Sequence, residues 1–321
     1  MIQIMRIKIS ILLSAIAISF GCQHQPKLSN TITIATLKGP SAMGMIRFID
    51  SVRTISNSCI KVEILSEPIQ VRKMVIEGSA DFAILPTTMA AILYNKGVDY
   101  QLIAIPVWGT LYLFGNDTSI TEWKHLRGKR INVMAKGMTP DVLFRYLLMQ
   151  NGLDPNKDVA LDYSFPTHID LANAVAAGQA NLGVISEPLV SLVMHRNAMV
   201  KSIFDLNAEW KKVLNVPIAQ TAFIVRGEFV DKNREVVDSI LRSYHYSTQW
   251  VNQNPDSAAN LIVKYKILPN ALVAANSIPR SNLDFVRAKA IKGQIESYLN
   301  IFYLMNPDII GGKLPDENFY Q

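Results

Sequence analysis

The sequence predicts an α/β protein made of two lobes, each a mostly parallel sheet flanked by helices. Two stretches about a hundred residues apart share one layout: residues 38–41 and residues 136–140 each follow an apolar run and open a helical pattern. Some forty residues later a second pair of matches, at 78–81 and 178–181, leads into a short apolar run in both copies. The chain therefore holds two strand–helix–strand–helix units of the same order. In open α/β sheets the ligand lies beyond the carboxyl ends of the strands.

Any doubly wound α/β protein repeats strand, glycine and helix in this way. Each match taken alone is also explained by a helix end followed by a strand start. The shared order and the nearly equal spacing favour two related lobes. Two such lobes facing each other form a cleft, which is where a small ligand is expected.

The first lobe alternates short apolar runs with segments whose apolar residues recur every three or four positions. Its predicted strands and helices alternate along residues 31–37, 41–52, 59–66, 69–77, 81–85 and 88–95. A long extended run follows at 102–114, interrupted by Pro106 and Gly109. A run of that length can leave one lobe and enter the other.

The second lobe repeats the pattern. Its predicted strands cover residues 130–135, 159–165 and 181–185, and its helices cover 139–151, 169–177 and 189–195. The extended run 218–226 is then a natural return path to the first lobe.

After Asp231 the pattern is nearly all helical. The predicted helices cover residues 234–252, 257–265, 272–276 and 285–302. We expect them to complete the first lobe. The predicted domains are then 31–115 with 225–321 for lobe 1 and 116–224 for lobe 2, joined by two hinge crossings near 111–115 and 223–227. Two crossings allow the lobes to close around a ligand.

The amino terminus reads as an export signal. Arg6 and Lys8 precede an apolar run at 9–20 that is too short to span a membrane. Gly21 and Cys22 follow, and a cysteine directly after a small residue resembles the cleavage box of bacterial lipoproteins, where the cysteine receives lipid. We therefore expect a signal peptide at 1–21, a linker at 22–30, and an exported chain anchored by Cys22 to a bacterial membrane, in the periplasm or at the cell surface. The alternative is an ordinary signal peptide with an incidental cysteine.

Composition excludes several classes. Without Arg6 and Lys8, 30 basic and 26 acidic residues remain, and they are scattered rather than gathered in a basic stripe, which argues against nucleic acid. Cys59 is then the one remaining cysteine, so no internal disulfide and no cysteine-based zinc site is expected. We expect Cys59 to be a buried, inert thiol. We expect neither a metal nor a cofactor.

The order of elements, the two crossings and the helical tail resemble type II periplasmic binding proteins of ABC importers. Within that fold the chain is similar to the branch of sulfonate, taurine, nitrate and thiamine-pyrimidine binding proteins. The motifs that carry the likeness lie at 38–44, 78–86, 126–131, 136–141, 152–155, 178–188, 250–255 and 311–315. The resemblance implies a monomeric receptor that captures a small solute between its lobes. It also implies delivery to an ABC permease and its ATPase.

In this architecture, helix starts and crossings converge on the cleft. The candidate ligand-binding residues at these positions are Lys38, Gly39, Ser41, Ala42, Met43, Pro86, Thr87, Thr88, Trp108, Lys136, Gly137, Met138, Thr139, Ser186, Glu187, Gln220 and Arg280. Helix N-termini offer free N–H donors and a partial positive charge. The alternative for each hydroxyl is ordinary capping of its own helix.

The charges of the candidates indicate the kind of solute. Lys38, Lys136 and Arg280 would favour an anion if two or more face the cleft, and the alternative is that they are solvated. Glu187 favours an amine or a heterocyclic N–H. Trp108 suits stacking on a flat ligand or core packing at the hinge. The solute is therefore expected to be anionic or heterocyclic.

The rival class is an enzyme on the same fold, similar to those of menaquinone or thiamine-pyrimidine synthesis. We expect no catalytic residues, because no Ser/His/Asp or Cys/His arrangement stands out. Of the histidines, only His168 lies near a predicted ligand loop. A binding module that signals to a sensor is a third alternative.

Overall fold

The computed structural model describes residues 31–165 and 167–321. The predicted signal peptide, the linker and the lipid site at Cys22 lie outside these residues. Within them, no helix combines the length and the apolar character that crossing a membrane requires.

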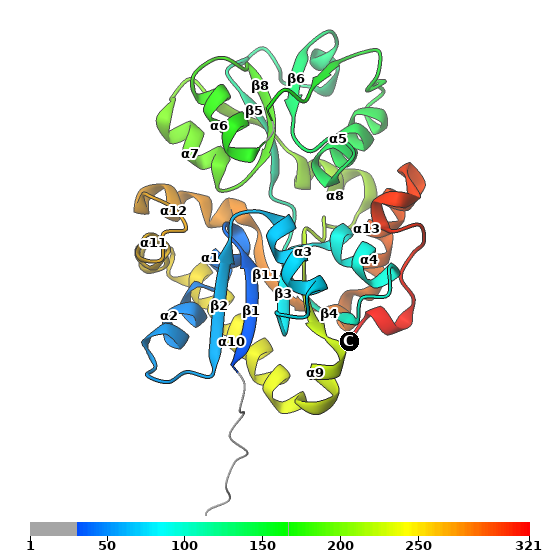
Figure 1. Cartoon of the computed structure of the whole chain (residues 1–321). Coiled ribbons are helices and arrows are strands. Elements are labelled where there is room, and N and C mark those ends of the chain that lie inside the picture. Colours follow the sequence, from blue (N-terminus) through cyan, green and yellow to red (C-terminus); the bar gives the residue numbers. More distant parts are fainter. Residues whose placement is uncertain (1–30, 166) are drawn as a thin grey trace, which may run out of the picture.

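Two sheets lie one above the other, each covered by helices (Figure 1). The first sheet has the order β11-β4-β10-β3-β1-β2 and the second the order β7-β6-β8-β5-β9. The strands of the first are β1 Ile32–Leu37, β2 Ile60–Leu65, β3 Phe82–Pro86, β4 Tyr100–Val107, β10 Thr221–Arg226 and β11 Leu283–Arg287. Those of the second are β5 Leu111–Gly115, β6 Arg130–Val133, β7 Ala160–Asp162, β8 Leu182–Ser186 and β9 Lys201–Asp205.

Most strands of each sheet end at the boundary between the lobes. β1 is parallel to β2 and β3, and β10 is antiparallel to both β3 and β4, so β4 runs in the direction of β3. In the second sheet β6 is parallel to β7 and β8, while β5 is antiparallel to β8 and β9. Of the strands that run the other way, β5 and β10 begin at the boundary after the chain has crossed it, and β11 follows the turn Pro279–Ser281 within the first lobe.

Helices cover both sheets. Those of the first lobe are α1 Pro40–Gly44, α2 Ile46–Thr54, α3 Pro68–Ile76, α4 Thr87–Asn95, α9 Gly227–Lys232, α10 Arg234–Gln253, α11 Pro255–Lys264, α12 Ala271–Ser277 and α13 Lys292–Met305. Those of the second are α5 Thr139–Gln150, α6 His168–Ala176, α7 Leu189–Arg196 and α8 Leu206–Leu214. Short 3₁₀ turns lie at Trp123–Leu126, Pro279–Ser281, Ala288–Ile291, Pro307–Ile310 and Glu317–Phe319.

The crossings lie nearer the cleft than the predicted domain bounds. Residues 111–115 were expected to close the first lobe, but β5 pairs with β8 and β9 in the second sheet. The first crossing is therefore the short link between β4 and β5, and the second is the link between α8 and β10. The backbone N–H groups of Trp108 and Gly109 donate hydrogen bonds to the carbonyls of Asn282 and Ile218, respectively. The first crossing is thereby joined to the residue before β11 and to the second crossing.

The helix expected at 41–52 is two helices, because Ser247 of α10 enters the break between them. The Ser247 hydroxyl donates to the carbonyl of Gly44 at 2.8 Å and accepts from the backbone N–H groups of Arg47 and Phe48 at 3.1 and 3.3 Å. A distant side chain thus satisfies the free donors at the start of α2. The spacing of apolar residues along 41–52 does not predict this break.

The helix expected at 285–302 is wrong at its start. Residues 283–287 form β11, which pairs antiparallel with β4. Leu283 and Phe285 are buried on either side of the exposed Asp284, an alternation typical of a half-buried strand. The pattern also missed β9, α8 and α9. Cys59, expected to be buried, is exposed just before β2.

Candidate ligand-binding site between the lobes

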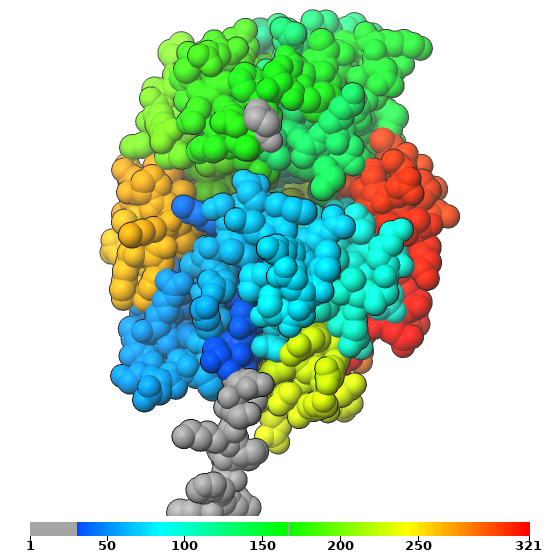
Figure 2. Space-filling view, viewed as in Figure 1, coloured from blue at the N-terminus to red at the C-terminus, as the bar shows by residue number. Residues whose placement is uncertain are grey.

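A cavity of about 430 Å³ lies between the two lobes. It is lined by Leu37, Lys38, Gly39, Pro40, Ser41, Ser66, Glu67, Pro68, Pro86, Val107, Thr110, His168, Ile169, Ser186, Glu187, Pro188, Leu189, Gln220, Thr221, Ile267 and Leu268. Figure 2 shows the lobes pressed close together around it, with the segment containing α12 on one side and that containing α13 on the other. The volume suits a small molecule.

The lower wall comes from the loops after β1, β2 and β3, because the carboxyl ends of these strands point at the second lobe. Gly39 has a backbone φ of 135°, a conformation that residues other than glycine rarely adopt. A Cβ at this position would stand 3.7 Å from Cδ of Pro188, in the opposite lobe. The glycine therefore brings the backbone of one lobe directly against the other.

The upper wall comes from the start of α6 and the turn between β8 and α7. The backbone N–H of Glu187 donates to the carbonyl of Thr110 at 2.9 Å, so this turn is anchored to the first crossing. Gln220 of the second crossing and Thr221 at the start of β10 form the floor of the cavity. Ile267 and Leu268, between α11 and α12, add an apolar side wall.

Several polar atoms at the floor have no protein partner. Oε1 of Gln220, Oγ1 of Thr221 and Oγ1 of the neighbouring Thr87 are buried without a hydrogen bond among the residues that the structure describes. Ser41, also buried, makes no side-chain cap to α1, whose N-cap residue is Gly39. A buried polar group left unpaired costs about 1–3 kcal/mol. These atoms therefore indicate a ligand that forms hydrogen bonds.

The buried carboxylate of Glu187 already has partners. It accepts a hydrogen bond from Nε of Arg280, and from the backbone N–H and the hydroxyl of Ser191 at 3.1 and 3.0 Å. Burial raises the pKa of Glu187, and the Arg280 guanidinium opposes that shift. Arg280 also lies 4.4 Å from the ring centroid of Tyr112. The charge that Arg280 was expected to offer an anion is therefore shared with Glu187.

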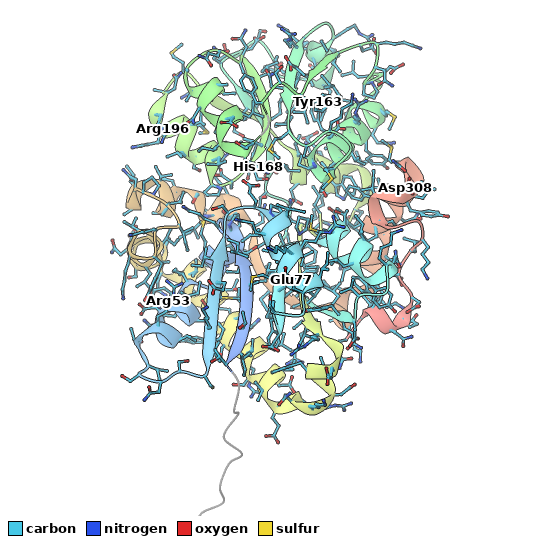
Figure 3. The ribbon with its side chains drawn as sticks, in the orientation of Figure 1. Arg53, Glu77, Tyr163, His168, Arg196 and Asp308 are labelled. Carbon is cyan, nitrogen blue, oxygen red and sulfur yellow. The ribbon has the colours of Figure 1, made fainter. Side chains whose placement is uncertain are left out.

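His168 is the first residue of α6 and lines the cavity at the edge of the second lobe (Figure 3). Burial lowers the pKa of His168 to about 4, so its ring is neutral at pH 7. A neutral imidazole offers one donor and one acceptor. At this position it suits a polar, uncharged group better than an anion.

The matched loops at 38–41 and 136–139 do not face each other. Instead Thr139 meets Thr88, hydroxyl to hydroxyl, at 2.9 Å, and both are buried. Lys136, Gly137 and Met138 are exposed and stand outside the lining, with Nζ of Lys136 5.5 Å from the ring centroid of Tyr163. The start of α5 thus contacts the start of α4 through this hydrogen bond.

Other candidates belong to the core. Ala42 and Met43 of α1 are fully buried. Trp108 is buried too, and its indole N–H donates to the carbonyl of Asp284 at 2.8 Å, which fits the packing alternative at the hinge. The candidates that line the cavity are Lys38, Gly39, Ser41, Pro86, Ser186, Glu187 and Gln220. Their role in binding stays a prediction.

Sequence reasoning missed part of the lining. Ser66, Glu67 and Pro68 follow β2, and the rule that ligands lie beyond strand ends applied to that loop as well. Glu67 and Gln70 also form a capping box that opens α3. Ile267 and Leu268 carried no signal, because only the packing of the helical tail brings them to the cleft.

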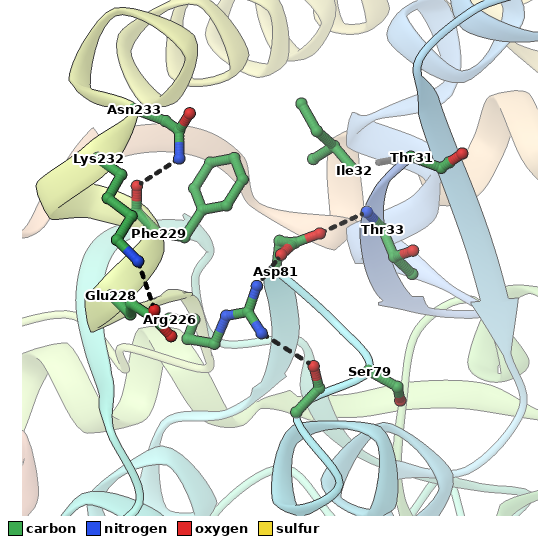
Figure 4. A pocket seen from close by; sticks show the side chains of 11 residues that line it. Thr31, Ile32, Thr33, Ser79, Asp81, Arg226, Glu228, Phe229, Lys232 and Asn233 are labelled. Carbon is green, nitrogen blue, oxygen red and sulfur yellow. Dashed lines mark hydrogen bonds and ion pairs between the residues drawn. The ribbon is translucent and has the colours of Figure 1, made fainter. Parts of the chain in front are cut away.

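A second cavity, of about 370 Å³, lies at the opposite ends of β1 and β3 (Figure 4). Its charged groups largely satisfy one another. Asp81 pairs with Arg226 and accepts from the N–H of Thr33, and Lys232 pairs with Glu228. Across the residues described, no group of three or more His, Cys, Asp or Glu is placed to hold a metal ion.

A model of the family described as NMT1/THI5 like matches residues 57–258. The match covers more than half of the chain, so the chain belongs to this family. A curated protein of Bacillus subtilis (strain 168), named "Putative binding protein YtlA", is 24% identical over 148 residues. That match spans 46% of this chain and 42% of the length of YtlA, so it covers less than half of the relative.

Solved structures confirm the two-lobed fold. The crystal structure of an ABC transporter from Parabacteroides distasonis is similar, with a TM-score of 0.78 and 26% identity, and the match covers 91% of this chain and 99% of that one. The periplasmic aliphatic sulphonate binding protein SsuA from Escherichia coli has a TM-score of 0.72 at 17% identity, covering 90% and 92%. The resemblance to type II periplasmic binding proteins is thereby confirmed. The functions named for these proteins are binding and transport, in agreement with the expectation of a non-enzyme.

Proposed function

We propose that this chain is an extracytoplasmic solute-binding protein that captures a small molecule between its lobes and delivers it to an ABC permease. The observation that carries the proposal is the cavity itself. Strand-end loops of both lobes build its two walls, and both crossings form its floor. The transport and binding functions named for similar proteins support the same role.

We favour a small, flat, largely uncharged solute with hydrogen-bonding groups over a simple anion. Of the three cations considered, only Lys38 lines the cavity, while Arg280 is paired with Glu187 and Lys136 stands outside. Proline, leucine and isoleucine side chains supply much of the remaining wall. An apolar wall with a few fixed polar atoms is typical of sites that hold a ring and orient its edge.

Native mass spectrometry of the purified protein tests this choice, because it weighs whatever solute is retained. Calorimetric titration with pyrimidines and with alkanesulfonates then compares the two classes directly. We expect a heterocycle to bind and a sulfonate to bind weakly. Tight binding of a sulfonate, lost in Lys38→Ala, would favour the anionic alternative instead.

An enzyme would require a reactive group at the solute. Among the residues described as lining the cavity, His168 is the one histidine and there is no cysteine. Recovery of unchanged solute after prolonged incubation with the protein is the expected result. A converted product would support the enzyme alternative.

We also propose that the chain is exported and held at a bacterial membrane by lipid on Cys22. A tethered receptor would remain near its permease. Cys22→Ser should move the protein from the membrane fraction to the soluble fraction or leave it unprocessed, whereas Cys59→Ser should leave it at the membrane. Wild-type protein recovered without lipid would contradict the anchor.

A further inference from the structure

The lobes meet on two flanks of the cavity, and the first flank is aromatic. Here α5 and α8 of the second lobe lie beside α13 of the first (Figure 1). Trp210 on α8 and Tyr298 on α13 are both fully buried, with ring centroids 5.9 Å apart. Tyr146 of α5 lies 5.3 Å from Trp210, and Phe302 lies 4.9 Å from Tyr298. A row of rings therefore crosses from one lobe to the other.

The hydrophobic core is continuous through this flank. One cluster of buried residues includes Leu85 of β3, Val184 of β8 and the rings of Trp210 and Tyr298. Separating the lobes here would expose several large rings to water. A packed aromatic side chain buries roughly 150–250 Å² of surface. Thr88 and Thr139 add a buried hydrogen bond between the lobes nearby. Opening at this flank would break a core.

The second flank is held differently. α7 of the second lobe faces α12 of the first (Figure 1). Leu192 of α7 packs into the core of the first lobe, and the ion pair between Glu187 and Arg280 joins the lobes beside it. The side chain of Arg280 is 28% exposed, whereas that of Glu187 is fully buried. Among the described residues, Leu192 is the one buried side chain that the second lobe adds to this core cluster, so separating α7 from α12 would expose fewer large apolar side chains than separating α8 from α13.

The cavity belongs to the second flank. Its described lining comes from the crossings, from the starts of α1, α3, α6 and α7, and from the loop before α12, with no residue from α5, α8 or α13. A solute can therefore enter without disturbing the aromatic row. Movement of α7 away from the first lobe would widen the access to the space lined by Pro188 and Leu189.

We propose that the cleft opens as a one-sided swing, in which the aromatic flank stays packed, the α7–α12 flank moves, and the pair of Arg280 and Glu187 is the latch that holds it closed. The one-sided opening goes beyond the proposed function. It rests on that function in one respect, namely that a solute has to enter the cleft. Arg280 is a positioning residue in this account, because it acts through Glu187.

Removing one partner of the latch should have a different effect from neutralising both. Removing Arg280 leaves the Glu187 carboxylate buried without its counter-charge, which strongly disfavours the closed arrangement. Making both residues neutral removes the unpaired charge together with the pair, and such replacements are often tolerated. The single variant should therefore open the flank, while the double variant should remain closed.

Distance measurements between paired spin labels test the proposal without any solute. The full chain carries Cys22→Ser and Cys59→Ser so that only introduced cysteines react. One label pair, His195→Cys with Leu272→Cys, spans α7 and α12, and another, Met149→Cys with Leu304→Cys, spans α5 and α13. All four positions are exposed.

In Arg280→Gln we expect the α7–α12 distance to widen while the α5–α13 distance stays unchanged. Glu187→Gln with Arg280→Gln should restore the narrow distribution. The matched control is Arg287→Gln, which breaks an exposed pair with Asp238 within the first lobe and should change neither distance. Equal widening of both distances, or no widening in Arg280→Gln, would overturn the proposal. Because the measurement requires no solute, it is independent of whether the proposed function holds.

Discussion

The aromatic flank and the latch flank join the same two lobes by different physical means. On the α5–α8–α13 side, Trp210 and Tyr298 are fully buried in a core that both lobes share. On the α7–α12 side, Leu192, an ion pair and the contact of Tyr112 with Arg280 join the lobes, and the cavity opens next to them. The two halves of the chain are built from one repeated layout. Repetition of the layout therefore does not make the two contacts between the lobes equivalent.

The two matched loops of the repeated layout also have different surroundings. The loop after β1 lines the cavity at Gly39 and Ser41, while its counterpart before α5 is either exposed or, at Thr139, closed against Thr88. One copy of the motif thus lines the cavity, and the other joins the lobes through Thr139.

Loss of the aromatic row should give the largest effect. Trp210→Ala should lower the free energy of unfolding by about 3–5 kcal/mol, the usual cost of removing a large buried ring. The indole N–H of Trp210 has no partner among the described residues, so this loss reports packing rather than a broken hydrogen bond. Denaturant unfolding measures it. Tyr246→Ala, at a 61% exposed position, is the control and should change stability by less than about 0.5 kcal/mol. A similar, small loss in both variants would mean that the aromatic flank is not a core.

Acid should lower the stability of the folded state through His168. The pKa of this ring is about 4 in the fold, against 6.5 normally, so the unfolded chain binds the proton more readily. The stability of the folded state should therefore fall as the pH is lowered from 6.5 towards 4, by at most about 3 kcal/mol. Glu187, whose pKa is raised by burial, contributes the opposite slope.

His168→Gln isolates the histidine effect, because glutamine stays neutral throughout this range. Unfolding curves at several pH values should show a shallower acid loss in the variant than in the wild type. Equal slopes in the two proteins would show that the ring is already exposed to solvent.

Ser41 and Thr139 compare matched positions on opposite flanks. Ser41→Ala should weaken solute binding by about 0.5–1.5 kcal/mol with little change in stability, because its hydroxyl caps no helix. Thr139→Ala should lower stability by a similar amount and leave affinity nearly unchanged, because it removes a buried hydrogen bond with Thr88. Calorimetry and unfolding on both variants separate the effects. The reverse assignment would place the ligand at α5.

The smallest effect should come from the two lysines. Lys38→Ala should alter affinity by less than about 1 kcal/mol and reduce its dependence on salt, because Lys38 is exposed at the cavity. Lys136→Ala should change affinity even less, because Lys136 lies over Tyr163 outside the lining. Titration at two salt concentrations measures both. A larger loss in Lys136→Ala would mean that the lobes close differently around the solute.

Much of the fold could be predicted from the sequence because its signals are local. The apolar runs at β1, β3 and β8 and the helical spacing of α5 and α10 act within a few residues, and the structure has these elements at nearly the expected places. The turn chemistry at Gly39 is local as well. These patterns also predicted two lobes, because each strand-end glycine is followed by a new helix.

Only the tertiary structure decided which strand ends face each other. Gly39 meets Pro188, and Thr88 meets Thr139, because the short crossings set the rotation of one lobe against the other. Ser247 splits a helix some two hundred residues away in the sequence, and β11 forms because β4 offers it an edge. Charge partners were decided in the same way: Arg280 was a candidate to hold an anion, and the fold pairs it with Glu187. Contacts between segments far apart in the chain depend on how whole lobes pack, and no local pattern of residues encodes that packing.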